Sequence, residues 1–125
     1  VRDKMKSKTL IVGNGDIQNY QDGIIRAKES GVDGVMIGRA SFGNPWIFRA
    51  DNYHPSIQER LEALLEHAKL FEKWYRHKKS FATLRKHFKA CASGFEGSKE
   101  LRIKLMETKN AAETAKVVKE FLKRY

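Results

Sequence analysis

Two short apolar runs, each ending in glycine and polar residues, limit most strongly what this chain can fold into. They predict strands over residues 9–13 and 34–38, and a segment with helical features lies between them over residues 20–30. A strand–helix–strand unit of this kind is the repeating part of a parallel α/β protein. Because parallel strands end on the same face, the two polar strand ends should lie side by side.

Local signals support the helix between the two strands. Asn19 is a favourable N-cap residue, and Gly31 stands where a residue in the left-handed conformation would end the helix. Ile24 and Ile25 give this helix a modest apolar stripe.

A sheet of only two parallel strands cannot bury both of its faces, and parallel sheets are normally covered on both. The chain has 125 residues and begins with Val1, and only a charged stub precedes the first expected strand. We therefore interpret it as a carboxyl-terminal fragment of a longer protein, with a complete small α/β domain as the alternative. The strands of such a fragment would expose apolar edges and faces, so we expect it to self-associate.

From about residue 56 the chain changes to apolar residues at helical spacing. Ser56 and Glu59 form a capping box that begins a helix extending to about Lys78. Further helices are expected over residues 80–93, 98–107 and 110–125. We expect the aromatic residues of the first two helices to lie in the core: Phe71, Trp74, Tyr75, Phe81 and Phe88. On the fourth helix the apolar positions are Ala112, Ala115, Val118, Phe121 and Leu122.

These patterns predict an α/β part over residues 1–53, followed by a small four-helix bundle over residues 54–125. The net charge of +10 is concentrated in the bundle, which holds 17 Lys and Arg against 9 Asp and Glu. The first part holds 8 against 6. A basic module favours a polyanionic partner such as nucleic acid, and a solvated helical surface fits the composition equally well.

The single cysteine, Cys91, excludes an internal disulfide and fits a reducing compartment, so we expect a cytoplasmic protein. Cys91 shares a predicted apolar face with Leu84 and Phe88, where a small buried thiol is expected. No apolar run approaches the roughly 18–20 residues of a membrane span. The histidines show no metal-ligand spacing, and we predict no metal site.

The two polar strand ends predict a phosphate site. A glycine after a strand lets the backbone approach an oxyanion closely, and free N–H groups at the start of a following helix point toward it. Arg39 adds a planar, permanently charged fork for phosphate oxygens, and Asn14 and Asp16 add polar groups. The alternative is a pair of structural turns with a solvent-exposed arginine.

Several motifs in this order closely resemble those of the tRNA-dihydrouridine synthases, over about residues 9 to 122. The motifs are Ile11–Ile17, Gly31–Ala40, Gly43–Phe48, Leu84–His87 and Gly97–Arg102. The resemblance implies an FMN-dependent oxidoreductase that reduces uridine in tRNA to dihydrouridine, with NADPH regenerating the reduced flavin. It also implies the last two βα units of a TIM-type (β/α)8 barrel that binds FMN, followed by a helical domain that helps to hold tRNA.

By motif match, the resemblance places Asn14, Gly15 and Asp16 on the phosphate and ribitol side of FMN, and Gly38 and Arg39 at its phosphate. The family's catalytic cysteine lies upstream of everything in this chain. We therefore expect no catalytic residue here, and no activity from this chain alone.

In the helical part, the resemblance makes Arg85, Lys86, Lys99 and Arg102 the leading tRNA contacts. Such cations neutralise phosphates and give a salt-sensitive affinity for RNA. His87 would stack on or hydrogen-bond a nucleotide, and the alternative for this residue is a helix–helix contact. Two other functions stay open: a stand-alone basic helical RNA-binding module, and a fragment of another FMN- or phosphate-binding barrel.

Overall fold

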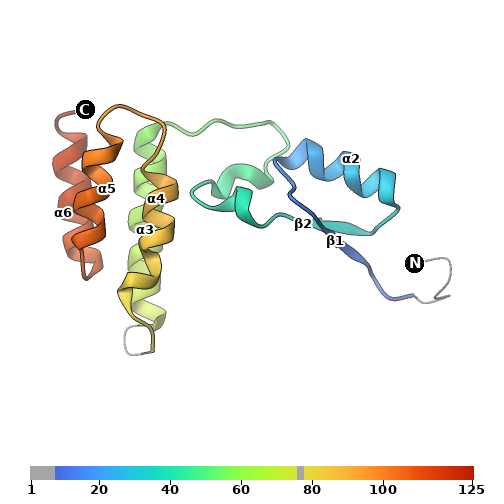
Figure 1. The fold of residues 1–125 in the computed structure, drawn as a ribbon, viewed down its shortest axis with the longest axis horizontal. Coiled ribbons are helices and arrows are strands. Elements are labelled where there is room, and N and C mark those ends of the chain that lie inside the picture. Colours follow the sequence, from blue (N-terminus) through green and yellow to red (C-terminus); the bar gives the residue numbers. More distant parts are fainter. Residues whose placement is uncertain (1–7, 76–77) are drawn as a thin grey trace. The chain divides into compact units, whose positions relative to one another are not determined.

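A computed structural model describes residues 8–75 and 78–125 (Figure 1). The chain divides into two compact units, one ending at His54 and the other beginning at Pro55. The first unit is built on a two-stranded sheet, and the second on α-helices that share one core. In the part of the chain that the structure describes, no helix combines the length and apolar character needed to cross a membrane.

The first unit contains the strand–helix–strand arrangement that the sequence predicts. Its elements are β1 (Val12–Asn14), α2 (Tyr20–Ser30), β2 (Gly34–Met36) and the 3-10 turns η1 (Arg39–Ser41) and η2 (Pro45–Phe48). The strands are parallel, with Val12 opposite Gly34 and Asn14 opposite Met36. Both are shorter than expected. β1 begins three residues later than expected, and just before it Ile11 N–H donates to the Asp33 carboxylate at 2.9 Å.

The ends of α2 are confirmed, and its packing face is not the expected one. The side chain of Asn19 accepts a hydrogen bond from Asp22 N–H at 2.9 Å, and Gly31 has a left-handed φ of 66°. The residue of α2 that faces the strand is Gly23, where an added Cβ would lie 3.0 Å from a methyl group of Val35. Ile24 and Ile25, which were expected to form the apolar stripe, are each about half exposed.

The first unit has little core of its own. In its described part, the buried hydrophobic residues are Ile17 and Ile47. Leu10, Val12 and Met36, which belong to or precede the strands, are all more than half exposed. The expected apolar surface on the strands is therefore present, while self-association through it stays a prediction.

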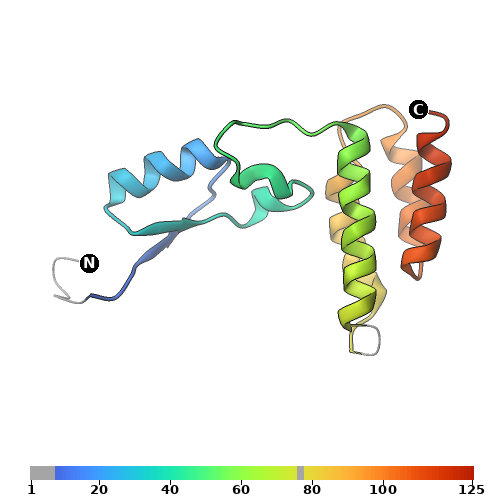
Figure 2. The same ribbon diagram turned by 180° about the vertical axis from the view of Figure 1, so that it is seen from behind.

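The second unit consists of helices that lie side by side in Figures 1 and 2. They are α3 (Ile57–Tyr75), η3 (Phe81–Leu84), α4 (Arg85–Cys91), α5 (Ser98–Glu107) and α6 (Ala111–Leu122). The predicted capping box at the start of α3 is confirmed, because Ser56 N–H donates to the Glu59 carboxylate at 2.8 Å and Glu59 N–H donates to Ser56 Oγ at 3.2 Å. The predicted bounds of α5 agree with the structure.

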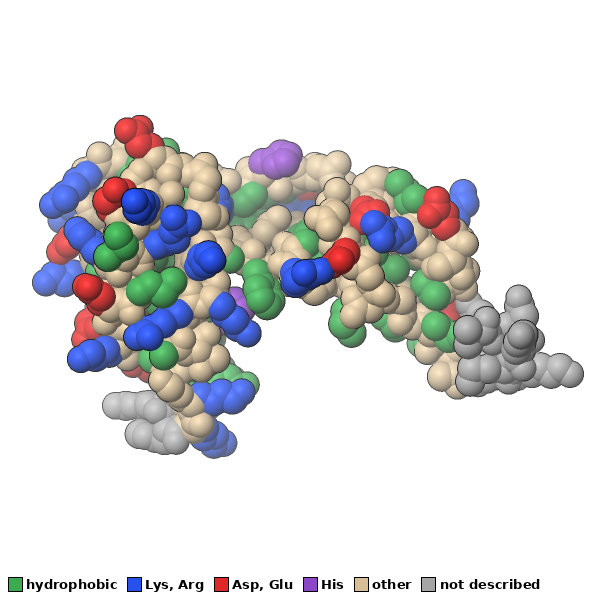
Figure 3. Space-filling view, in the orientation of Figure 1, with side chains coloured by type: hydrophobic (Ala, Val, Ile, Leu, Met, Phe, Trp, Pro, Cys, Tyr) green, Lys and Arg blue, Asp and Glu red, His purple; other side chains and the backbone are tan. Residues whose placement is uncertain are grey.

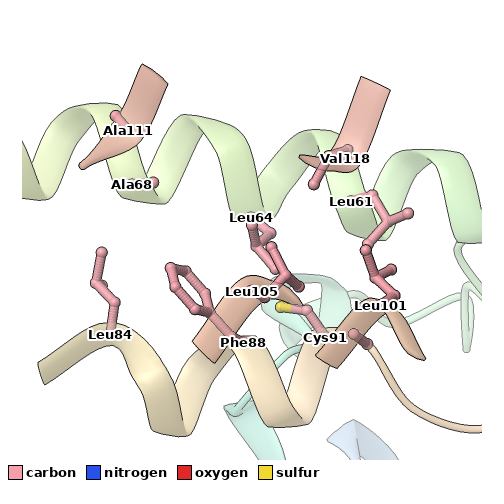
Figure 4. Packing of buried hydrophobic residues seen from close by; sticks show 11 residues of the cluster. Leu61, Leu64, Ala68, Leu84, Phe88, Cys91, Leu101, Leu105, Ala111 and Val118 are labelled. Carbon is pink, nitrogen blue, oxygen red and sulfur yellow. The ribbon is translucent and has the colours of Figure 1, made fainter. Parts of the chain in front are cut away.

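One hydrophobic core holds the second unit together (Figure 4). Phe88 and Cys91 of α4 point toward the leucines of α3 and α5, and Leu84 of η3 extends the same row. Phe88 is fully buried as predicted, but Trp74 and Tyr75 at the end of α3 are exposed, so their assignment to the core was wrong. Helix α6 buries Ala111, Thr114 and Val118, whereas Ala112 is exposed.

Helix α6 begins at a well-formed cap, which gives a first prediction. Asn110 Oδ1 accepts from Glu113 N–H at 2.8 Å, and the Glu113 carboxylate accepts from Asn110 Nδ2 at 3.0 Å and from Lys109 N–H at 2.8 Å. Replacing Asn110 by alanine removes both hydrogen bonds between Asn110 and Glu113 and should lower the free energy of unfolding by about 1 kcal/mol. Urea unfolding checks this, with the exposed Ala112→Ser as control. A loss below about 0.3 kcal/mol would contradict the role of the cap.

Candidate phosphate site and nucleic-acid interface

The residues predicted at the two strand ends lie together. One open depression of about 750 Å³ is lined by Asn14, Gly15, Asp16, Ile17, Gln18, Gly38, Arg39 and Ala40. The parallel register produces this arrangement, because the last residue of β1, Asn14, pairs with the last residue of β2, Met36. Residues that follow the two strands therefore leave the sheet at the same edge.

An ion pair crosses this depression. The guanidinium of Arg39 donates from Nη2 to Asp16 Oδ1, and both side chains are largely exposed, Arg39 by 81% and Asp16 by 65%. Asp16 has a left-handed φ of 46°, a conformation that aspartate tolerates better than most residues. Since a guanidinium carries five N–H donors, pairing with one carboxylate oxygen leaves donors that can hold an anion.

A second arginine anchors the loop that follows β1. Arg26 of α2 donates from Nη1 to the carbonyl of Gly15 at 3.0 Å and from Nε to Asp22 at 2.8 Å. Asp22 in turn accepts from Gln18 N–H at 2.9 Å. The hydrogen bond from Gln18, and then that from Arg26, lowers the pKa of Asp22 below its usual value. Sequence reasoning missed this anchor, although Asp22 and Arg26 have the i,i+4 spacing of a helical ion pair.

The two glycines of the depression fit a phosphate group. An added Cβ at Gly15 or Gly38 would meet nothing within 4 Å, and neither residue has a left-handed φ. A missing side chain leaves the backbone N–H groups open to an oxyanion, as in other anion-binding turns. Together with Arg39, the residues present form a suitable phosphate cradle.

The predicted RNA contacts are accessible but do not form one cluster. Arg85 and Lys86 are exposed at the start of α4, Lys99 is exposed, and Arg102 is partly buried. Helices α4 and α5 pack together and run in opposite directions, so the two pairs lie toward different ends of this helix pair (Figure 1). Figure 3 shows lysine and arginine side chains over the α4–α5 face, with acidic side chains mainly toward α6.

His87 makes a helix–helix contact. Its ring packs edge-to-face against His67 of α3, with ring centroids 4.7 Å apart and an interplanar angle of 74°. Partial burial lowers the pKa of both imidazoles, and repulsion from His67 and Lys86 further lowers the pKa of His87. This is the contact that the alternative interpretation of His87 expected, and a nucleotide contact by this residue stays a prediction.

The histidine pair predicts a pH-dependent stability. The folded pKa values of His67 and His87 lie below 6.5, so the unfolded chain binds protons more readily and stability falls as the pH drops below about 6.5. We expect a lower Tm at pH 5.5 than at pH 7.5. In His67→Gln this difference should shrink, and in His54→Gln, which alters an exposed histidine of the other unit, it should persist. A Tm that rises toward pH 5.5 would contradict the prediction.

Cys91 is buried, and burial raises the pKa of its thiol. A thiol in this state is a poor nucleophile, so the structure supports the expected packing role. Within residues 8–75 and 78–125, no group of three or more His, Cys, Asp or Glu residues is placed to hold a metal ion.

Comparisons with known proteins identify the family. A model of the family described as dihydrouridine synthase (Dus) matches residues 1–125. The chain belongs to this family. A "Probable tRNA-dihydrouridine synthase" of Staphylococcus aureus (strain MRSA252) is 38% identical over 122 residues, 97% of this chain, and a protein of the same name from Staphylococcus epidermidis (strain ATCC 12228 / FDA PCI 1200) gives the same values. "Probable tRNA-dihydrouridine synthase 2" of Bacillus subtilis (strain 168) is 35% identical over 126 residues, covering the whole chain.

These matches confirm the family resemblance that the motifs indicated. They also show that the chain spans only part of its dihydrouridine synthase relatives. It covers 37% of the two staphylococcal proteins and 39% of the Bacillus subtilis protein.

Proposed function

We propose that this chain contributes the FMN-phosphate site and a tRNA-binding surface to a tRNA-dihydrouridine synthase. In this proposal the enzyme reduces uridine in tRNA to 5,6-dihydrouridine, with NADPH as the reductant, and acts in the cytoplasm. Family membership and the names of the relatives support the activity. The observation that carries the proposal is that all five residues assigned to FMN line one depression.

Residues 1–53 are proposed to be the last two βα units of the FMN-binding TIM-type barrel. Val12 and Met36 of the two parallel strands are exposed, and Ile17 and Ile47 are the buried hydrophobic residues in the described part of the unit, so most of the apolar surface is uncovered. Further strands and helices would cover this surface in a complete barrel. A phosphate site near the end of the last strands is also the usual place for such a site in these barrels.

The residues of the depression have distinct roles in this proposal. When bound and reduced by NADPH, FMN would supply the hydride for the uracil ring. Arg39 holds the FMN phosphate, Gly15 and Gly38 offer backbone N–H groups, and Asn14 adds a polar side chain. Asp16 orients the guanidinium of Arg39 through their ion pair and can accept hydrogen bonds from ribitol hydroxyls.

Backbone-amide NMR of the chain tests the phosphate site directly. We expect FMN and inorganic phosphate to shift the amide signals of Gly15 and Gly38, because both ligands carry the oxyanion. Riboflavin, which lacks the phosphate, should shift them much less. Equal shifts with riboflavin and FMN would contradict a phosphate cradle at this position.

Residues 54–125 are proposed to bind tRNA through cations of α4 and α5 that are exposed or, in the case of Arg102, partly exposed. If Arg85, Lys86, Lys99 and Arg102 each neutralise one phosphate, raising the salt from about 50 to 200 mM should weaken binding of unmodified tRNA about 50- to 150-fold. Fluorescence anisotropy with labelled tRNA measures this change. Binding that does not respond to salt would contradict phosphate contacts by these residues.

A further inference from the structure

An exposed tryptophan stands at the end of α3. Trp74 is 68% exposed, and Lys73 Nζ lies 6.0 Å from the centroid of its ring. The neighbouring aromatic residues are more covered, since Phe71 packs edge-to-face against Phe81 with centroids 6.3 Å apart. Trp74 therefore presents a large ring to solvent at a place where the helical core has already ended.

Beyond Glu72, the chain from Lys73 onward carries only positive charge for a long stretch. From Lys73 to Phe95 the chain contains no aspartate or glutamate. The described lysines and arginines of this stretch are all exposed: Lys73, Lys78, Lys79, Arg85, Lys86 and Lys89. A protein surface with cations and no anions over this length complements a polyanion.

The backbone holds two of these lysines beside the end of α3. The carbonyl of Tyr75 accepts hydrogen bonds from Lys78 N–H at 2.8 Å and from Lys79 N–H at 3.1 Å. Lys79 Nζ also lies 4.8 Å from the centroid of the Tyr75 ring. Lys78 and Lys79 are thus kept close to Tyr75, and Lys73 lies beside the ring of Trp74 itself.

We propose that Trp74 stacks on an unpaired base of tRNA, while Lys73, Lys78 and Lys79 contact the flanking phosphates. An aromatic face for the base with cations for the backbone is the usual combination in proteins that bind single-stranded nucleic acid. This inference rests on the proposed function and adds a binding surface beyond the cations of α4 and α5. Trp74 is also the right kind of residue, because indole offers the largest stacking face of the natural side chains.

Substitutions at Trp74 separate stacking from general apolar contact. In anisotropy titrations of the whole chain with unmodified tRNA, Trp74→Ala should bind about 5- to 150-fold more weakly. Trp74→Phe, which keeps an aromatic face, should recover most of the affinity, and Trp74→Leu, which keeps apolar area only, should not. Leu70, one turn earlier and also partly exposed, provides the matched control, and Leu70→Ala should bind like the parent.

Salt dependence separates the roles of tryptophan and lysine. Trp74→Ala should leave the slope of log affinity against log salt unchanged, because it removes no phosphate contact. Lys78→Ala and Lys79→Ala should each reduce the slope by a little under one. In Trp46→Phe, which leaves Trp74 as the only tryptophan, tRNA should quench the remaining fluorescence.

The outcomes distinguish this inference from the proposed function. If the parent binds tRNA and Trp74→Ala binds equally well, the stacking role is overturned and the tRNA-binding function stands. If Leu70→Ala loses affinity while Trp74→Leu keeps it, the surface around Trp74 and Leu70 is a general apolar contact and stacking is again overturned. A parent chain that binds no tRNA at low salt would overturn both proposals.

Discussion

Replacing Arg39 by alanine is expected to weaken FMN binding about 10- to 100-fold. Loss of charge-assisted hydrogen bonds to a phosphate removes roughly 1.5–3 kcal/mol, and each 1.4 kcal/mol is about tenfold in affinity. Arg39 is well suited to this role because its guanidinium lies in the depression and is largely exposed. Titration of the chain with FMN, followed by flavin fluorescence or by the amide signals of Gly15 and Gly38, measures the change.

Arg49 offers a matched control for this substitution. It is also exposed and paired with a carboxylate, since its Nε donates to Asp51 Oδ1 at 3.0 Å, and it does not line the phosphate depression. Arg49→Ala should therefore bind FMN like the parent. The affinity for riboflavin should be equal in Arg39→Ala and the parent. An Arg39→Ala chain with parental FMN affinity would remove Arg39 from the phosphate site.

The second large effect is expected from Phe88→Ala, which should lower the free energy of unfolding of the helical unit by about 3–5 kcal/mol. Phe88 is almost completely buried in the core shared by α3 to α6, and its ring lies 6.0 Å from that of Phe81. A unit of this size has only about 4–10 kcal/mol of stability in total, so the variant should be largely unfolded at elevated temperature. Urea unfolding followed by circular dichroism measures the loss.

Lys89 is the control for this substitution, because it is the next residue on α4 and is exposed. Lys89→Ala should change the free energy of unfolding by no more than about 0.5 kcal/mol. If Phe88→Ala costs less than about 1 kcal/mol, the core around α4 is not the main source of stability in this unit.

Local signals in the sequence were reliable wherever the determining interactions lie within a few residues. The N-cap at Asn19, the left-handed Gly31 and the capping box of Ser56 with Glu59 all occur as predicted. Each depends on a side chain and a backbone group of the same turn, so no distant element can change it. The residues proposed to hold a phosphate lie together for a related reason, because parallel strands bring their carboxyl ends to one edge.

Errors arose where burial depends on the length and position of a neighbouring helix. Helical periodicity places Trp74 on the same apolar face as Phe71, but it does not show that Phe71 packs against the core while Trp74 lies beyond it. On α6, alanines lie on both sides of the apolar stripe, so the sequence leaves the edge of the buried face undefined. Helical periodicity therefore did not show that Thr114 is buried. Its hydroxyl hydrogen-bonds the carbonyl of Asn110 at 2.9 Å and contacts the hydroxyl of Thr108 at 3.1 Å.

The sequence by itself determined the strand–helix–strand unit, the helix caps, the family and the group of residues at the strand ends, because short-range geometry and parallel pairing define them. The tertiary structure alone decided that Arg26 anchors the Gly15 loop, that His87 packs on His67, and that Trp74 remains in solvent. These features depend on which surfaces meet across long separations in the chain. Packing between elements, and not the pattern within one element, determines them.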